Sequence, residues 1–594
     1  CGSASSPPAG AADAPRGPRP TTCYHAAVRL LPASLLVLLL VLFAGLGLAV
    51  MWRTPTGAGA GGPAMPASLG GKPQGHVYTG FAEEPSDVNP LTSHEQVARR
   101  LVLSHTHDTL LDRDPVDGAL RGCLAERWEV SADGTTCTFT LREGVRFSDG
   151  APLTMADVLF GWELAEAGHL PLGSVAAAFG RVAAVDVLDD RRLRVHLRGT
   201  HFAGAAAVGT AWIVAQRRFF DDRVRRRLEP GEALPAVASR RFAELLDQVD
   251  RACGPGTGPY ALHADPDGVD NWRPGEDLLL VRNEHSWRRA AEPGTWNFAG
   301  VRTLFRDHAA GRNAFLRGEL DWFSDPQIDE LLASRPELGE RYRKLVYDYA
   351  LLGAYRCVWN CRRVPFDDAR VREALGMLFP REEVVAVCGG AAKPAAAHAK
   401  PGAPGYPDVS PLPFDPPAAR RLLREAGYDP AGGRPLAVSL LALDGSEPLR
   451  RIVELFRDAA KRAGVDLDVR QRDYAAFVAE KGQLDWDGLL VLQYFDAWGD
   501  PYRFLHSEGL DNEGAWQHPE ADRLAAAAQV ERDPVRRAAL WRDLHRLAHR
   551  EQPAALIVHP MATVLLNAHV EDAKPGPVGL IPERAWVAPE FQRR

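Results

Sequence analysis

The sequence predicts an α/β protein of two dissimilar lobes, preceded by one transmembrane helix. Residues 115–200 mix short alternating apolar–polar runs, which predict antiparallel hairpins, with short helices. Residues 368–558 instead alternate helices with short apolar strands, a pattern typical of a sheet covered by helices. Two lobes with separate cores imply an interface, and ligand clefts form preferentially at such interfaces.

Length and composition describe a globular chain. It has 594 residues, a net charge of −7, 46% apolar and 25% charged residues, which excludes wholesale disorder and collagen-like structure. An acidic chain without a long basic block is not expected to bind nucleic acid. Eight cysteines in 594 residues are too few for a disulfide scaffold.

An uncharged stretch near the N-terminus predicts a membrane anchor. Residues 30–52 contain no charge between Arg29 and Arg53, and 23 residues make about 35 Å of helix. A buried core helix and a cleaved secretory signal are the alternatives, but the length favours a retained span. Basic residues precede the stretch, so residues 1–29 are expected in the cytoplasm and the remainder outside it. The Gly/Pro-rich residues 53–75 predict a flexible linker.

Two hairpins and several helices are predicted in the body. Asp133-Gly134 separates two alternating runs, the strongest short-range hairpin signal. Asp415-Pro416 predicts a helix start, with Asp as N-cap and Pro at the first position, and Gly427 predicts its end. The predicted strands are 128–130, 136–141, 183–187, 193–197, 465–469, 488–492 and 555–558, and the predicted helices are 157–165, 368–378, 415–427, 446–463 and 533–550.

A series of sequence motifs resembles the motifs of one protein family and occurs in the same order. The motifs are LAERWEV at 124–130, FTLREGVRFSDG at 139–150, GTGPY at 256–260, GELD at 318–321, PFDD at 365–368, AGY at 426–428 and Asp500-Pro501. They resemble the extracytoplasmic solute-binding proteins of peptide-type ABC importers, the oligopeptide- and dipeptide-binding family. The resemblance covers about residues 80–594.

This resemblance implies a bilobal class II periplasmic-binding-protein-like fold with an extra inserted domain, closing on a ligand about a hinge. The expected organisation is a cytoplasmic tail 1–29, an anchor 30–52, a linker 53–75, a first lobe 76–350 with an inserted subdomain at about 111–252, a second lobe 351–549 and a return to the first lobe at 550–594. The implied protein is a monomer at the cell membrane, with its body in the periplasm or extracellular space. It would pass peptides to ABC permease subunits served by a separate ATPase.

The candidate ligand-binding residues are Asp496, Trp498, Tyr494, Asp500, Tyr355 and Glu84. In peptide binders of the family, an Asp about three residues before the acidic-Pro step pairs with the ligand's α-ammonium group. Ala497 occupies that position here, so the resemblance assigns the role to Asp496 only through a one-residue bulge. Asp500 precedes Pro501, which also suits a turn or helix start. The aromatic residues suit either a cleft wall or ordinary core packing.

No enzyme, metal or cofactor signal is recognised. The sequence lacks a GxSxG elbow, an HExxH helix and a Walker A loop. His105 and His107 are spaced so that they would point apart on a helix. Two alternatives stay open: a binding protein for a non-peptide solute such as an oligosaccharide or metal chelate, and a sensory or scaffold protein on the same fold.

Overall fold

The computed structural model describes most of the chain beyond the expected linker. The described residues are 75–93, 95–170, 172, 179–248, 253–262, 271–325, 328–349, 352–444, 447–495, 499–576 and 579–593. The expected anchor 30–52 lies outside these residues. Within the described ranges, no helix combines the length and the apolar character needed to cross a membrane.

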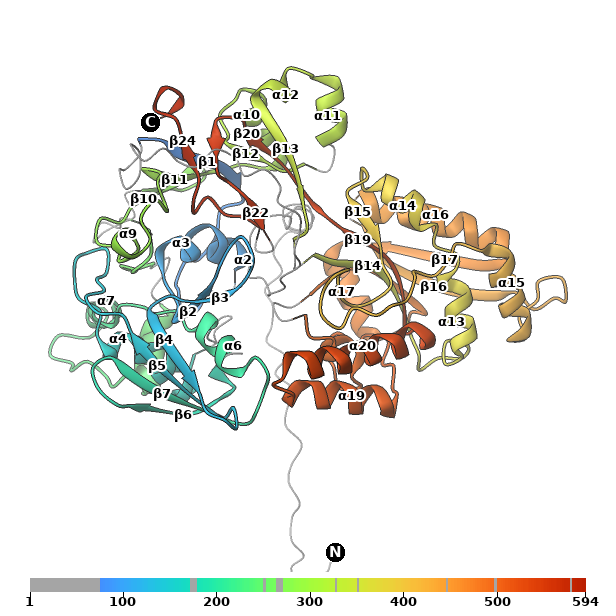
Figure 1. Cartoon of the computed structure of the whole chain (residues 1–594), viewed down its shortest axis with the longest axis horizontal. Helices are drawn as coiled ribbons and strands as arrows, with labels where there is room; N and C mark the ends of the chain where they lie inside the picture. The colour runs from blue at the N-terminus through green and yellow to red at the C-terminus, as the bar shows by residue number, and fades with distance from the viewer. Residues whose placement is uncertain are drawn as a thin grey trace, which may run out of the picture.

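Four larger sheets organise the described chain into two lobes (Figure 1). One sheet of the first lobe has the order β1(Val77–Ala82), β11(Gly300–Phe305), β10(Asp277–Arg282), β8(Tyr260–Ala261), with β9(Trp272–Arg273) paired to β10. A second sheet of this lobe has the order β12(Trp322–Phe323), β20(Ala562–Asn567), β13(Tyr342–Tyr347). Its inserted sheet has the order β4(Ala125–Val130), β5(Thr136–Leu141), β7(Arg192–Leu197), β6(Val182–Val187). The second lobe holds β15(Ala392–Pro394), β19(Ala554–Pro560), β14(Leu352–Trp359), β18(Gly488–Tyr494), β16(Leu436–Leu443), β17(Val465–Arg472).

Short two-stranded ribbons and the helices complete the described fold. The ribbons are β2(Leu111–Arg113) with β3(Leu120–Gly122), β21(Val570–Glu571) with β24(Trp586–Val587), and β22(Pro575–Gly576) with β23(Gly579–Leu580). The first-lobe helices are α2(Gln96–Ala98), η2(Arg99–Leu103), α3(Ser104–Thr106), α4(Met155–Ala167), α6(Gly204–Ala211), α7(Arg217–Arg225), α8(Arg240–Asp247), α9(Arg288–Ala291), α10(His308–Leu316), α11(Ile328–Ser334), α12(Leu338–Arg341) and η3(Pro589–Phe591). The second-lobe helices are α13(Ala369–Gly376), α14(Arg381–Val387), α15(Pro416–Glu425), α16(Glu447–Ala463), α17(Tyr474–Gln483), α18(Tyr502–Leu505), α19(Pro519–Val530) and α20(Pro534–Glu551).

The predicted elements of the body are confirmed, with boundaries shifted by a few residues. The Asp133-Gly134 turn joins β4 to β5, which pair antiparallel with Trp128 opposite Phe139. The Asp415 carboxylate accepts a hydrogen bond from the backbone N–H of Ala418 at 2.8 Å and so caps α15. On α16 the predicted apolar face is buried, and Phe456 stacks on Phe379 with ring centroids 4.2 Å apart.

The chain crosses between the lobes twice, side by side. β13 leads into β14 in one direction, and β19 leads into β20 in the other (Figure 1). β14 pairs antiparallel with β19 in the second lobe, and β13 pairs antiparallel with β20 in the first. β19 falls within the range 550–594 expected to return to the first lobe, yet it pairs within the second-lobe sheet, and β20 is the strand that re-enters the first lobe. Two adjacent crossings are the arrangement about which two lobes can rotate.

The lobes also touch away from these crossings, between the inserted sheet and the α19–α20 pair. The backbone N–H of Phe202 donates to the Gln529 carbonyl at 2.9 Å, and the Phe202 ring lies edge-on to Trp541 with centroids 5.4 Å apart. The Arg537 guanidinium lies 4.5 Å from the centre of the Phe202 ring. Arg532 donates to the Ser131 carbonyl at 2.9 Å. We call these residues the inter-lobe contact.

Candidate functional site

A cavity of about 190 Å³ lies within the first lobe, where η2 and α3 face the ribbon β2–β3 and helix α6. Its lining comes from six or more separate stretches of the chain and includes both charged and apolar side chains. The lining residues are Arg99, Arg100, Leu103, Ser104, His105, His107, Asp108, Thr109, Asp112, Arg113, Pro115, Arg121, Cys123, Thr210, Ile213, Arg288, Trp296, Ile581 and Glu583. We call it the first-lobe cavity.

Local sequence explains how the helical wall of this cavity forms. η2 is a π-helix, a rare geometry that is frequent at functional sites, and it contributes Arg99, Arg100 and Leu103 to the lining. The GTGPY segment packs directly on the following turn, where Gly258 N–H donates to the Thr106 carbonyl at 2.9 Å. A Cβ on Gly256 would lie 1.8 Å from that same carbonyl oxygen, so only glycine permits this approach.

Two groups of ion pairs lie in the lining of the cavity. Arg288 lies 3.0 Å from Asp108, and Arg121 lies 2.8 Å from Glu583 and 2.9 Å from Asp112. Burial by itself would raise the pKa of Asp108, but the charge of Arg288 and the hydrogen bonds it receives bring that pKa below its ordinary value. The pKa of Arg121 and that of Arg288 are raised, because their carboxylate partners outweigh their burial.

The three remaining arginines of the cavity have pKa values below the ordinary value. Burial lowers the pKa of Arg99 and Arg100, and it lowers the pKa of Arg113 to about 10 despite the nearby Asp112 charge. His105 and His107 are buried as neutral rings, each with a pKa lowered to about 4 by desolvation. The lining contains five arginines and three carboxylates, and two further carboxylates lie beside it, Glu292 at 3.0 Å from Arg288 and Asp114 at 4.0 Å from Arg121.

Arg100 connects the first-lobe cavity to the crossing strands. Its guanidinium lies 5.9 Å from the centre of the Trp322 ring, which packs against the apolar cluster that contains Tyr347 and Tyr349. Tyr349 belongs to an apolar cluster against which Tyr494, which ends β18 in the second lobe, is packed. This apolar cluster thus lies beside the two crossings between the lobes and extends to Tyr494 at the end of β18.

The structure describes four of the six predicted ligand-binding residues. Asp496 and Trp498 lie outside the described residues, so their role stays a prediction. Tyr494 ends β18 and packs against the apolar cluster beside the two crossings between the lobes. Tyr355, on β14, is 6% exposed and packs in the second-lobe core.

Two predicted carboxylates have structural partners. Asp500 accepts a hydrogen bond from the Tyr502 N–H at 3.0 Å and another from the Gln529 side chain, so it orders the turn into α18. Glu84 accepts from Trp272 Nε1 at 2.8 Å and from the Gly275 N–H at 2.9 Å, which holds the turn between β9 and β10. A binding role for either residue stays a prediction, but each carboxylate already accepts hydrogen bonds from other groups of the protein.

Sequence reasoning missed the cavity arginines. Asp108 and Arg288 are 180 positions apart, and Arg121 and Glu583 are 462 apart, so their pairing leaves no local signal. The adjacent pair Arg99-Arg100, ahead of the buried Leu101, Val102 and Leu103, is the one local hint, because two charges interrupt an otherwise apolar face.

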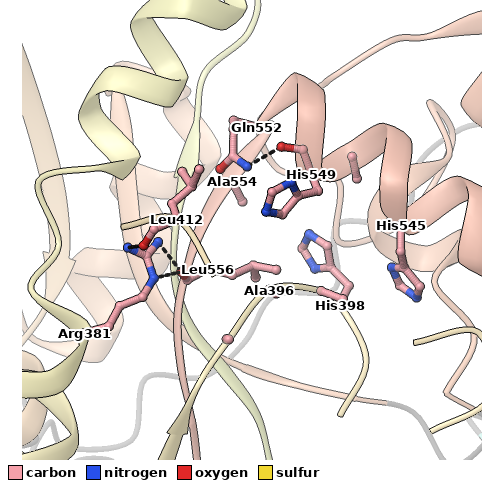
Figure 2. Close-up of a pocket in the computed structure, with 12 residues that line it drawn as sticks. Arg381, Ala396, His398, Leu412, His545, His549, Gln552, Ala554 and Leu556 are labelled. Atoms are coloured by element: carbon pink, nitrogen blue, oxygen red, sulfur yellow. Dashed lines mark hydrogen bonds between the residues drawn. The ribbon is translucent and has the colours of Figure 1, made fainter. Parts of the chain in front are cut away.

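A second, much smaller pocket lies in the other lobe, between α20, β19 and the segment after β15 (Figure 2). Figure 2 shows His398, His545 and His549 around it, with Arg381 donating to the Leu556 carbonyl at 3.0 Å on the opposite side. Its volume of about 10 Å³ holds no more than about one water molecule, so it is not a solute site. Within the described ranges, no group of three or more His, Cys, Asp or Glu side chains is placed to hold a metal ion.

The chain is similar over most of its length to several known binding proteins. It is 24% identical over 467 residues to di/tripeptide-binding protein 2 of Pseudomonas aeruginosa, covering 74% of this chain and 81% of that protein. It is 24% identical over 514 residues to heme-binding protein A of Haemophilus influenzae, covering 82% and 86%. The fold matches the oligopeptide-binding protein AppA of Bacillus subtilis in complex with a nonapeptide, with a TM-score of 0.66, 19% identity and coverage of 87% and 100%.

The family assignment rests on the larger part of the chain. The sequence profile of the bacterial extracellular solute-binding proteins, family 5, matches residues 119–515, which span the inserted sheet, the hinge and most of the second lobe. The motif order and the bilobal fold agree with this match. The chain therefore belongs to the family 5 bacterial extracellular solute-binding proteins.

Proposed function

We propose that this protein is the membrane-tethered solute receptor of an ABC-type importer and that it captures peptides between its lobes. One observation carries the proposal: two lobes, each with its own core, are joined by two adjacent strand crossings lined by an aromatic cluster. Such a joint permits closure on a solute and reopening for release. Transport energy would come from a separate ATPase, and the role is binding rather than catalysis.

Peptides are the proposed ligand class because the free α-ammonium group of a peptide would meet a carboxylate. Asp496 follows β18 by two residues and would pair with the α-ammonium group in the second lobe. The name of the Pseudomonas aeruginosa relative, a di/tripeptide-binding protein, supports this class. The name of the Haemophilus influenzae relative favours a second candidate, a non-peptide solute such as a metal chelate.

The tether is proposed from the sequence alone. Residues 30–52 would anchor the chain once through the cell membrane, and residues 53–75 would let the body reach a permease while remaining outside the cytoplasm. The body would act as a monomer.

The identity of the captured solute tests the proposed function directly. The full-length protein is purified in mild detergent without added ligand and is analysed by native mass spectrometry. We expect adducts whose masses and fragmentation are those of short peptides. Adducts that are exclusively haem, metal chelates or oligosaccharides would contradict the peptide assignment and favour the second candidate.

A further inference from the structure

Three histidine rings are buried in the second lobe, close to the end of β18. His398 and His545 line the same small pocket, whose volume of about 10 Å³ admits no more than about one water molecule (Figure 2). His559, on β19, contacts the ring of Phe495, which directly follows β18; the two ring centroids are 6.0 Å apart. Each of these histidines is at most 4% exposed. We call the three of them the histidine cluster.

The histidine cluster contacts the chain on both sides of the predicted amine anchor, Asp496. Before Asp496, the Nδ1 atom of His398 lies 3.2 Å from Oε1 of Gln493 on β18. After Asp496, the His398 ring stacks on Phe504 of α18, with centroids 5.7 Å apart. The rings of Phe495 and Phe504 also meet, with centroids 6.2 Å apart. The cluster therefore supports both the end of β18 and the helix α18, which flank Asp496 in the sequence.

The hydrogen bonds around the cluster suit neutral rings. The Nδ1–H group of His559 donates to the Gly353 carbonyl oxygen at 2.8 Å, so a second proton on this ring would go to Nε2. That Nε2 atom is buried and has no hydrogen-bond partner in the described part of the chain, and the same holds for Nδ1 of His545. A proton added to His559 would thus be a buried donor without an acceptor, which is costly.

The charges around the cluster are mostly positive and oppose protonation. The charged or titratable groups around it are Arg356 on β14, which pairs with Glu513, Arg381 on α14, His549 on α20, Lys393 on β15, Lys400 after β15 and Asp348 between β13 and β14. The carboxylate of Asp348 is itself paired with Lys400. Burial lowers the pKa of all three rings, to about 4 for His559, and the charge of Arg356 adds to the shift of His398.

We propose that His398 and His559 are positioning residues for the segment 495–501: they hold its two ends in place for a solute while both rings are neutral, and they release these ends when the rings are protonated. That this segment binds the solute rests on the proposed function, in which Asp496 is the amine anchor. A histidine that reaches water has a pKa of about 6.5. The supported arrangement therefore binds fewer protons than one in which the rings are hydrated. It is favoured above about pH 6.5 and is progressively disfavoured as the pH falls toward 4.

Mild acid should consequently weaken solute binding. Between pH 7 and pH 5, each ring with a pKa of about 4 in the supported arrangement can shift the equilibrium by up to about twentyfold. Tripeptides keep their own charges in this range, because the α-carboxyl pKa is about 3.5 and the α-amino pKa is about 8. We expect the affinity of the wild type for a tripeptide pool to fall about tenfold or more between these pH values.

Two measurements on the full-length protein test this role, one with solute and one without. Titration calorimetry gives the affinity for the tripeptide pool at pH 7 and pH 5. Hydrogen exchange of the α18 backbone amides, referred to α16 in the same sample, reports support of the segment without any solute. The variants are His398→Asn and His559→Asn, whose amide N–H can replace the Nδ1 donor and cannot titrate. The control is His169→Asn, at an exposed position.

We expect both α18 protection and tripeptide affinity to fall at pH 5 in the wild type and in His169→Asn. Each cluster variant should show a shallower pH dependence of both quantities, whatever its affinity at pH 7. If α18 protection behaves in this way while no tripeptide binds at either pH, the positioning role stands and the peptide function fails. If tripeptides bind equally well at both pH values and α18 protection is unchanged, the positioning role is refuted while the peptide function stands. A pH dependence that persists in full in both cluster variants would also refute it.

Discussion

At the scale of single residues, charge is arranged differently in the two lobes. The first lobe carries the arginine-lined cavity, and the second lobe is expected to present the Asp496 carboxylate after β18. The sequence singles out Asp496 because a local motif surrounds it. It does not reveal the cavity, because the lining residues become neighbours only through folding.

Asp496→Ala tests the proposed amine anchor. In a closed, water-poor site the substitution leaves an ammonium group buried and unpaired, at a cost on the order of 3–5 kcal/mol. Tripeptide binding should therefore weaken by at least about a hundredfold in titration calorimetry. N-acetylation of the tripeptides should weaken wild-type binding similarly and matter much less to the variant.

Asp500 provides the comparison for this experiment. Because its carboxylate orders the turn into α18, Asp500→Ala should lower the melting temperature more than Asp496→Ala does. The anchor would instead be Asp500 if Asp496→Ala bound normally while a folded Asp500→Ala did not bind. Equal binding of acetylated and free tripeptides by the wild type would remove the amine anchor altogether.

Buried histidines in the second lobe make stability depend on pH. Desolvation lowers the pKa of His545 to about 3 and that of His559 to about 4, so both rings are neutral in the folded chain. The unfolded chain binds protons on these rings near pH 6.5, so their contribution to stability is present above that pH and is lost as the pH falls toward the folded pKa values. Between pH 7 and pH 5 each should reduce the free energy of unfolding by about 2 kcal/mol.

This dependence is measured as the melting temperature at pH values from 7.5 to 5. His545→Gln should make the dependence shallower, whatever it does to the melting temperature at pH 7.5. The exposed His169 is the matched control, and His169→Gln should leave the dependence as in the wild type. An unchanged dependence in His545→Gln would show that the ring is not buried as a neutral group.

At the scale of elements, the sequence predicts what is local and misses what is not. The hairpin β4–β5 and helices α15 and α20 are predictable because turn glycine, capping Asp and N-terminal Pro act within a few residues. β19 is predicted as a short strand, but its extension to Pro560 and its continuation into β20 of the other lobe are not. Partner choice in a sheet depends on contacts far apart in sequence, which periodicity does not encode.

The inter-lobe contact should stabilise the closed arrangement. Phe202→Ala removes the edge-on contact with Trp541 and the cation–π contact with Arg537, each worth about 1 kcal/mol. Tripeptide affinity should fall about fivefold to a hundredfold, because closure then draws on more of the binding free energy. Arg536→Ala is the control, since this side chain is 71% exposed and pairs with Glu531 of its own lobe. Unchanged affinity and dissociation rate in Phe202→Ala would show that the contact does not hold the lobes together.

At the scale of the whole molecule, the expected tether sets where the receptor works. If residues 30–52 span the membrane, the full-length protein should remain in the membrane fraction after carbonate extraction of cells. The body should be degraded by protease added outside the cytoplasmic membrane. Release of the full-length chain by carbonate would contradict the anchor, and a soluble form beginning near residue 60 would show a cleaved signal instead.

The two lobes are proposed to close on a solute about the paired crossings. Small-angle X-ray scattering of residues 75–594, with and without a saturating tripeptide pool, measures that change most directly. Occupancy in the same samples is verified by native mass spectrometry. We expect a smaller radius of gyration with bound tripeptides than without, and a reduced difference when Phe202→Ala weakens closure. An identical radius of gyration for the wild type in the empty and fully occupied states would contradict it.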